Sequence, residues 1–243
     1  MAGGETMTGA ARQGRLNVVG VGPGDPDLVT LKAARLIAAA DVVAYPVTES
    51  GRSRARATAG DHIGPEQVEL GFRLPMSVDP APAQRAYDAV SHDIRGHLAA
   101  GRTVALLCEG DPFFYGSAMY IYQRLAADCD VHVVPGVSSL TATAAVAGVP
   151  LASRNDVLKV VPAPLEEAAL RGELDGCHAA AIIKVGRHFA KVRRVIEALG
   201  RVDDTVLVEA ATGEAQRVVA LAHLPAGAQD YFSTVLIAKG GRA

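Results

Sequence analysis

Three short segments carry residue types that could bind a ligand, and each follows a run of apolar residues. They are Gly20–Pro26, Glu109–Ser117 and Pro135–Ser139. Glycine lets the chain turn sharply and lets a ligand approach the backbone. Serine hydroxyls offer hydrogen-bond donors, and the rings of Phe113 and Phe114 can provide an apolar wall. If the three apolar runs are parallel strands of one sheet, the segments gather at its carboxyl edge and form a binding crevice.

The first segment departs from the glycine fingerprint of dinucleotide-binding folds. That fingerprint is G-x-G-x-x-G opening directly into a helix. Here Asp25 stands in place of the third glycine, and Pro23 and Pro26 interrupt the pattern. The second predicted strand ends in Tyr45-Pro46 rather than in an acidic residue that could hold a ribose. We therefore expect a ligand other than a nicotinamide cofactor.

In the first half of the chain, short apolar runs alternate with helical patterns. This alternation predicts βαβ units and a mostly parallel sheet. The predicted strands are residues 16–21, 42–45, 103–108 and 131–134, and the predicted helices are 31–40, 83–99, 117–127 and 138–147. Thr30 is expected to cap the first helix. The polar stretch 48–67 is expected to be a loop.

The second half of the chain changes character. Its predicted strands are 157–161, 179–185, 205–209, 217–220 and 233–238, with a helix at 189–199. Strands so closely spaced near the end indicate an antiparallel portion and a mixed sheet. We therefore predict two α/β domains, at 15–135 and 136–243, with a junction helix within 136–150 and a disordered tail at 1–14.

Composition excludes several classes of partner. The 243 residues are 49% hydrophobic with a net charge of -2, so no nucleic-acid or membrane partner is expected. No apolar run reaches the roughly 18 residues of a membrane span, and the first residues lack the apolar region of a secretory signal. Cys108, Cys129 and Cys177 are isolated, and the seven histidines show no metal-ligand spacing. We expect a cytoplasmic protein without a disulfide framework or a metal site.

The motifs taken together resemble those of the tetrapyrrole methylases, the class III methyltransferases. The resemblance rests on Val19–Asp25, Gly110–Pro112 and Pro135–Ser139, and it extends from about Leu16 to Ala238. Further motifs look like those of the precorrin-2 C(20)-methyltransferases within that family. These motifs are Cys108–Ser117, Lys184–His188, Val208–Thr212 and Gln216–Val218.

The resemblance implies a homodimer of two-domain α/β chains, a tetrapyrrole substrate, and S-adenosylmethionine bound in the cleft between the domains. Carried over by motif, the cofactor contacts fall on Pro23, Glu109, Gly110, Asp111, Phe114, Ser138, Ser139, Ile183 and Ala211. Lys184 stands where the wider family would have the apolar end of a strand.

Methyl transfer from a sulfonium to a nucleophilic ring carbon depends chiefly on positioning, so no catalytic dyad is expected. A proton must still leave the product. Tyr115 and Glu209 are candidates for assisting this step, and their alternative roles are a packed aromatic ring and a structural ion pair.

A substrate rich in carboxylates would suit Arg52, Arg54 and Arg56. In an extended chain these alternating residues would point to one side, and the alternative is a solvated loop. His188 is expected to contact substrate or to support the structure. Two further hypotheses stay open: a cobalt-containing or other corrin precursor as the acceptor, and a tetrapyrrole carrier or chelatase without methyltransferase activity.

Overall fold

The computed structural model describes residues 14–75, 79–224, 227 and 233–238. The predicted tail at 1–14 therefore lies, except for Gly14, outside the described residues. The chain forms two compact units. The first contains the residues through Gly22 together with Pro26–Gly136, and the second contains Pro23–Asp25 together with the residues from Val137 onward.

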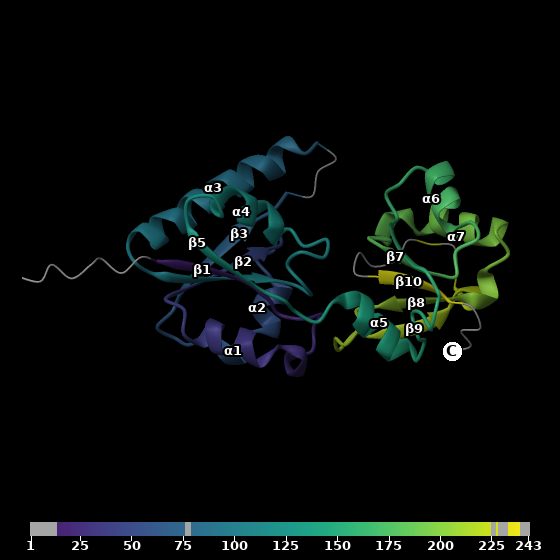
Figure 1. Cartoon of the computed structure of the whole chain (residues 1–243), viewed down its shortest axis with the longest axis horizontal. Coiled ribbons are helices and arrows are strands. Elements are labelled where there is room, and N and C mark those ends of the chain that lie inside the picture. The colour runs from purple at the N-terminus through teal and green to yellow at the C-terminus, as the bar shows by residue number, and fades with distance from the viewer. Residues whose placement is uncertain (1–13, 76–78, 225–226, 228–232, 239–243) are drawn as a thin grey trace, which may run out of the picture. The chain divides into compact units, whose positions relative to one another are not determined.

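The first unit, at the left of Figure 1, is built on a five-stranded, fully parallel sheet. Its strand order is β3-β2-β4-β1-β5. Its strands are β1 (Arg15–Gly20), β2 (Val42–Val47), β3 (Val68–Arg73), β4 (Thr103–Cys108) and β5 (Asp130–Val134). Because all five run the same way, their carboxyl ends share one edge of the sheet. The predicted parallel sheet is confirmed.

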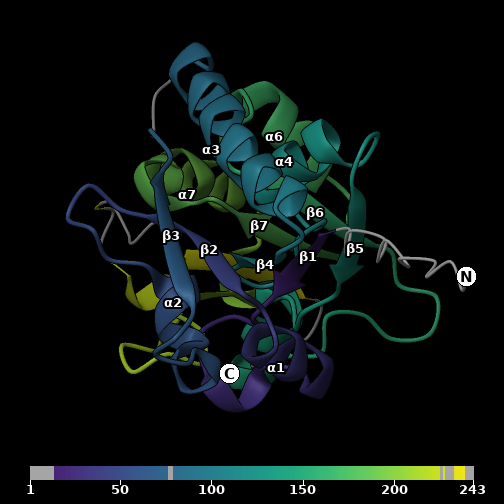
Figure 2. The same cartoon turned by 90° about the vertical axis from the view of Figure 1, so that its left-hand side faces the viewer.

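Helices cover both faces of this sheet. They are α1 (Leu31–Ala38), α2 (Arg54–Thr58), α3 (Ala81–Ala99) and α4 (Ala118–Leu125). Figure 2 shows α3 and α4 on one side of the sheet and α1 and α2 on the other. Strand β4 explains the layering, since Leu106 packs with the α3 and α4 residues whereas Leu107 packs with the α1 and α2 residues. Apolar residues at successive positions of a strand are typical of a parallel sheet buried on both faces.

The second unit contains a mixed sheet with the order β6-β7-β10-β8-β9. Its strands are β6 (Leu158–Pro162), β7 (Ala179–Ile183), β8 (Thr205–Glu209), β9 (Arg217–Ala220) and β10 (Ser233–Ala238). Strands β6 and β7 are parallel, whereas β10 runs antiparallel to both β7 and β8, and β9 runs antiparallel to β8. The predicted antiparallel portion is thus confirmed.

Three helices pack on this second sheet: α5 (Ser139–Ala147), α6 (Glu167–Leu174) and α7 (Phe189–Ala198). Figure 1 shows α6 and α7 on one face and α5 on the other. The core beneath α6 and α7 includes Leu170, Phe189 and Ile196 together with Ile182 and Val235 of the sheet. Short 3-10 turns complete the chain at Pro26–Leu28, Gly60–His62, Gly186–His188, Val202–Asp204 and Leu221–His223.

The structure corrects the sequence prediction at three elements. The stretch 48–67, expected to be a loop, contains the helix α2, and the elements β3 and α6 were not predicted. Helix α2 has only five residues and is capped by Ser53, whose hydroxyl accepts a hydrogen bond from the amide of Arg56. So short a helix shows no apolar periodicity. Strand β3 lies at the edge of the sheet beside β2 and is largely exposed, so its pattern lacks the continuous apolar run of an interior strand.

No helix among the described residues is long and apolar enough to cross a membrane. All three cysteines are free thiols, with Cys108 buried and the other two partly exposed.

Candidate functional site

The three predicted loops meet at the carboxyl edge of the first sheet, as expected. The amide of Gly110 donates to the carbonyl oxygen of Gly22 at 2.7 Å, and the Gly22 amide donates back at 3.3 Å. The third loop is tied in by Asp111, whose Oδ2 accepts the amide of Gly136 at 3.1 Å. The other carboxylate oxygen of Asp111 accepts the amide of Phe113 at 2.9 Å. Oδ2 of Asp111 therefore ties the third loop to the second, and Oδ1 fixes the second loop internally.

The glycines at this junction serve close packing of the chain against itself. A side chain on Gly136 would collide with the carbonyl oxygen of Gly110. A Cβ on Gly20 would come within 2.6 Å of the amide nitrogen of Gly136. The sequence predicts that glycines in these loops allow a ligand to approach the backbone. At Gly20 and Gly136, the backbone that approaches is the protein's own.

Glu109 stands directly after β4 and next to Gly110 of this junction. Its side chain is 33% exposed, and its Oε2 lies 3.8 Å from Nε of Arg54. Burial raises the pKa of the Glu109 carboxyl, and the positive charge of Arg54 opposes this rise. Burial also raises the pKa of the neighbouring Cys108 thiol to about 12. The thiol therefore stays protonated at neutral pH and is not a nucleophile.

The three arginines do not form the common array that the extended-chain argument predicted. Arg54 and Arg56 lie on helix α2, where residues two apart point in different directions. Arg54 faces Glu109, whereas Arg56 makes a bidentate ion pair with Glu69, at 2.9 and 3.0 Å. Arg52 precedes the helix, and its Nε donates to the hydroxyl of Ser50 at 3.3 Å.

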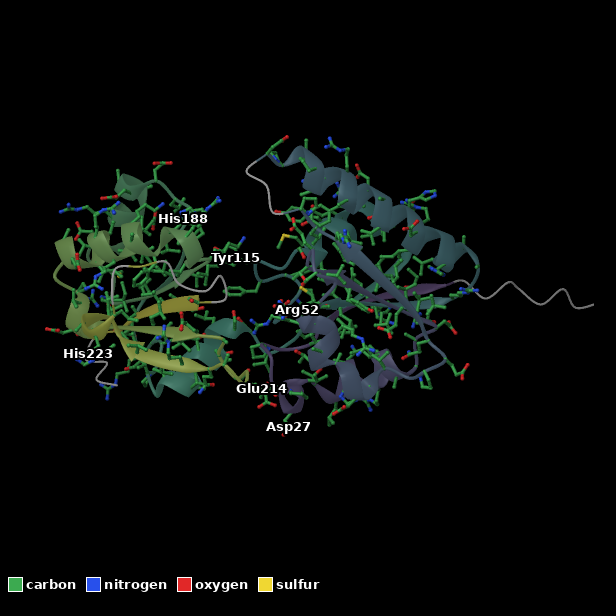
Figure 3. The ribbon with its side chains drawn as sticks, turned by 180° about the vertical axis from the view of Figure 1, so that it is seen from behind. Asp27, Arg52, Tyr115, His188, Glu214 and His223 are labelled. Carbon is green, nitrogen blue, oxygen red and sulfur yellow. The ribbon has the colours of Figure 1, made fainter. Side chains whose placement is uncertain are left out.

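The loop between β4 and α4 presents aromatic rings at its surface. The side chain of Phe113 is 50% exposed and that of Tyr115 is 44% exposed. Tyr115 adopts a φ of 57°, a left-handed conformation that is unusual for a residue with a side chain. Its ring meets that of Phe114 edge to face with a centroid separation of 5.3 Å. Figure 3 shows Tyr115 and Arg52 at the end of the first unit where the parallel strands stop.

Several predicted site residues belong to the second unit. Ser138 caps α5, with its Oγ accepting the amide of Leu140 at 3.1 Å, and Ser139 is the first residue of that helix. Ile183 ends β7, and Lys184 follows with a φ of 57°. The chain leaves the strand here, so Lys184 is not a buried strand residue. Ala211 is buried in the turn after β8.

Two further candidates of the second unit are Glu209 and His188. The Glu209 side chain is 14% exposed, and its Oε2 accepts Nε of Arg217 at 2.6 Å. His188 is partly buried ahead of α7. Burial lowers the pKa of its imidazole, and the charges of Lys191 and Arg187 lower it further. His188 is thus held neutral at neutral pH.

Sequence reasoning missed Glu69 and Tyr45, which anchor α2. The hydroxyl of Tyr45 donates to Glu69 Oε2 at 2.6 Å, the same oxygen that Nε of Arg56 contacts. The pairing of β2 with β3 sets Val43 opposite Glu69, so Tyr45 and Glu69 share the sheet face that α2 covers. Recognising β3 would have revealed this arrangement, because alternation along a strand fixes which residues share a face.

The junction could hold an organic cofactor through its exposed ring at Phe113, the carboxylate of Glu109 and the backbone of the three loops. Within the part of the chain that the structure describes, no group of three or more His, Cys, Asp and Glu side chains could hold a metal ion.

Comparison with protein families gives one match that covers most of the chain. The model of the tetrapyrrole (corrin/porphyrin) methylases matches residues 15–224. A precorrin-2 C(20)-methyltransferase of a Sinorhizobium species is 42% identical over 233 residues, covering 92% of this chain and 95% of that protein. A cobalt-precorrin-2 C(20)-methyltransferase of Salmonella typhimurium is 29% identical over 232 residues, covering 93% of this chain and 97% of that protein.

Solved structures share the fold. A uroporphyrin-III C-methyltransferase from Thermus thermophilus, in complex with S-adenosylhomocysteine, matches with a TM-score of 0.69 and 24% identity. The match covers 92% of this chain and 92% of that one.

Proposed function

This chain belongs to the family of tetrapyrrole (corrin/porphyrin) methylases, and on that premise we propose that it methylates precorrin-2 at C-20 to give precorrin-3A. It is a methyltransferase, and S-adenosylmethionine is the methyl donor of the proposed reaction. The main support for this substrate is the similarity to a protein named precorrin-2 C(20)-methyltransferase. The two sequences are 42% identical over nearly the full length of both chains.

The residues at the loop junction suit this donor. The exposed ring of Phe113 can stack on an adenine, and the Glu109 carboxylate offers negative charge near a cationic cofactor. The predicted contacts in the second unit, Ser138, Ser139, Ile183 and Ala211, complete the proposed set. The hydroxyl oxygen of Ser138 accepts a hydrogen bond from the Leu140 amide, so the hydroxyl proton is still available to donate a hydrogen bond.

When bound, S-adenosylmethionine supplies a methyl group on a positively charged sulfur. The task of the chain is then to hold the acceptor carbon in line with that group. Effective molarities of about 10⁵ M or more are available from orientation alone. The hydrogen bonds between Gly22 and Gly110, and between the Gly136 amide and Asp111, serve this task because they tie the three loops together.

We further propose that Arg52 contributes to binding of the substrate carboxylates. Arg54 and Arg56 are engaged with Glu109 and Glu69, so their part in substrate binding is indirect. His188 remains a proposed substrate contact in the second unit.

Incubation with S-adenosylmethionine and precorrin-2, followed by mass measurement, tests the proposal. One added methyl group is expected, and its position at C-20 is read from labelled carbon. A parallel incubation with cobalt-precorrin-2 tests the second candidate, which the likeness to the Salmonella typhimurium protein favours. If neither compound gains a methyl group, the proposed function is wrong, and a carrier or chelatase becomes the better hypothesis.

We also propose that the protein is a homodimer and works in the cytoplasm. The three free thiols suit a reducing compartment. Light scattering tests the assembly, with twice the mass of one chain expected.

A further inference from the structure

Two carboxylates stand in the loop after β4, and their surroundings differ. Asp111 uses both oxygens to accept backbone amides. The side-chain oxygens of Glu109 accept no hydrogen bond from the described residues. Their nearest cation, Nε of Arg54, lies at 3.8 Å, within ion-pair range but beyond hydrogen-bond range. Glu109 thus keeps its capacity to accept a proton, although two thirds of its side chain is buried.

The proposed reaction requires such an acceptor. A meso carbon that bears hydrogen gains a methyl group, so a proton must leave for the conjugated ring to be restored. Among the candidates from the sequence, Glu209 has an oxygen bonded to Arg217 at 2.6 Å. The ring of Tyr115 packs edge to face against that of Phe114. Neither is placed as well as Glu109 to take up a proton.

We propose that Glu109 is the proton acceptor for C-20 methylation and that Arg54 is the positioning residue that keeps it ionised. The inference rests on the proposed function. In the step, the carbon–sulfur bond breaks with its electron pair left on sulfur, and a π pair of the macrocycle forms the new carbon–carbon bond. The C-20–hydrogen bond then breaks, its electron pair returns to the ring, and the proton passes to a Glu109 oxygen and on to solvent.

The charges around Glu109 make this assignment chemically consistent. Burial raises the pKa of Glu109, which makes the carboxylate a stronger base than an exposed one. Arg54, on α2, lowers that pKa and so keeps the group ionised in the free protein. Among the described residues, the protonated thiol of Cys108 on β4 lies close to both Glu109 and Asp111, whose negative charges help to raise its pKa.

The primary test is Glu109→Gln, which keeps the size of the side chain and removes the basic oxygen. A general base contributes roughly a hundredfold or more, so kcat for precorrin-2 should fall by about that factor. S-adenosylhomocysteine lacks the sulfonium charge that the Glu109 carboxylate is proposed to face, so affinity for it, measured by calorimetry, should change far less than kcat. In this variant proton loss limits the rate, so deuterium at C-20 should slow turnover further.

The matched control is Glu167→Gln on α6. Glu167 is also paired with an arginine, Arg194 at 2.8 Å, but the pair is exposed on the second unit. Its kcat should equal that of the wild type. Thermal unfolding of both variants shows whether each is folded.

The pH profile supplies a readout that a purely structural role would not move. The ionised carboxylate is the active form, so kcat/KM should fall as the pH drops through the raised pKa of Glu109. Because Arg54 lowers that pKa, Arg54→Met should move this acid limb to higher pH. Arg54→Lys keeps the charge and should restore the limb to its wild-type position.

Two results would overturn the inference. One is a folded Glu109→Gln protein whose kcat matches wild type. A raised KM for S-adenosylmethionine in that protein would make Glu109 a cofactor contact only. The other is an acid limb that stays in place in Arg54→Met. If the wild-type protein itself fails to methylate precorrin-2 or its cobalt complex, the proposed function fails instead.

Discussion

At the scale of single residues, the arginines near β2 show how local conformation assigns side chains to different tasks. Arg54 and Arg56 each face a glutamate, whereas the Nε of Arg52 donates to the Ser50 hydroxyl and its side chain is exposed. An exposed cation at the loop edge can meet a carboxylate of an incoming substrate without first breaking an ion pair.

We therefore predict that Arg52→Ala raises the KM for precorrin-2 about threefold to fivefold at low salt. The factor corresponds to an exposed charge contact of roughly 1 kcal/mol. The effect should shrink as ionic strength rises, because salt screens exposed charges. Steady-state kinetics at two salt concentrations check this, with Arg194→Ala on α7 as the matched exposed arginine. An unchanged KM at low salt would place the carboxylate contacts elsewhere.

The sequence identified the loop residues but not what each side chain contacts. Three glycine-bearing loops after apolar runs predicted the meeting of Gly22, Gly110 and Gly136, because parallel strands end at one edge. The engagement of Asp111 with two amides and the approach of Arg54 to Glu109 depend on residues far apart in the chain. No local pattern records such contacts. Assuming an extended chain at 52–56 gave the wrong directions for Arg54 and Arg56.

At the scale of elements, the cluster of Arg56, Glu69 and Tyr45 helps to hold α2 to the sheet. Helix α2 has five residues, too few for a helix to be stable by itself. Ala55 is buried against the sheet, and the side chain of Arg56 reaches Glu69 on β3. Since Arg54 lies on the same helix, the cluster also fixes how Arg54 meets Glu109.

We predict that Arg56→Met lowers the free energy of unfolding by about 0.5–1 kcal/mol at neutral pH, a modest value because both partners are partly exposed. Arg56, and then Tyr45, lower the pKa of Glu69. The contribution is therefore present above the ordinary glutamate pKa of about 4.3 and is lost as the pH falls through the lowered pKa. Urea unfolding at neutral and acid pH measures both values.

A double-mutant cycle provides the control for this prediction. In a Glu69→Gln background, Arg56→Met should have little further effect, because the ion pair is already gone. Equal losses in both backgrounds would mean that Arg56 stabilises α2 through packing of its stem and not through Glu69.

Interior elements could be predicted and peripheral ones could not. Strand β4 reads as a continuous apolar run because it is covered on both faces. The strand β3 and the helix α6 carry more exposed and charged residues, so their apolar signals are interrupted. Helix α1 was predicted with its cap, and Thr30 Oγ1 accepts the amide of Ala33 at 3.2 Å as expected.

At the scale of the whole molecule, the two units show how the connections between successive strands determine whether those strands run parallel or antiparallel. Helices between successive strands give the parallel sheet, and the short connection between β8 and β9 gives an antiparallel pair. The sequence could not assign Pro23–Asp25, which lie between two parts of the first unit but belong with the second. The amide of Asp25 donates to the hydroxyl of Thr212 at 3.2 Å, a contact across most of the chain.

We predict that S-adenosylhomocysteine binds one per chain and stabilises the protein against heat. A ligand at 100 times its dissociation constant adds about 2.7 kcal/mol when it binds only the folded state. For a chain of this size, that energy raises the Tm by roughly 5–10 °C. Calorimetry gives the stoichiometry, and thermal unfolding gives the shift.

NAD is the matched control, because the loop Gly20–Pro26 lacks the dinucleotide fingerprint, and it should leave the Tm unchanged. A carrier or chelatase would show no shift with S-adenosylhomocysteine, so an unchanged Tm at saturating ligand would count against the assignment of the loop junction to the methyl donor.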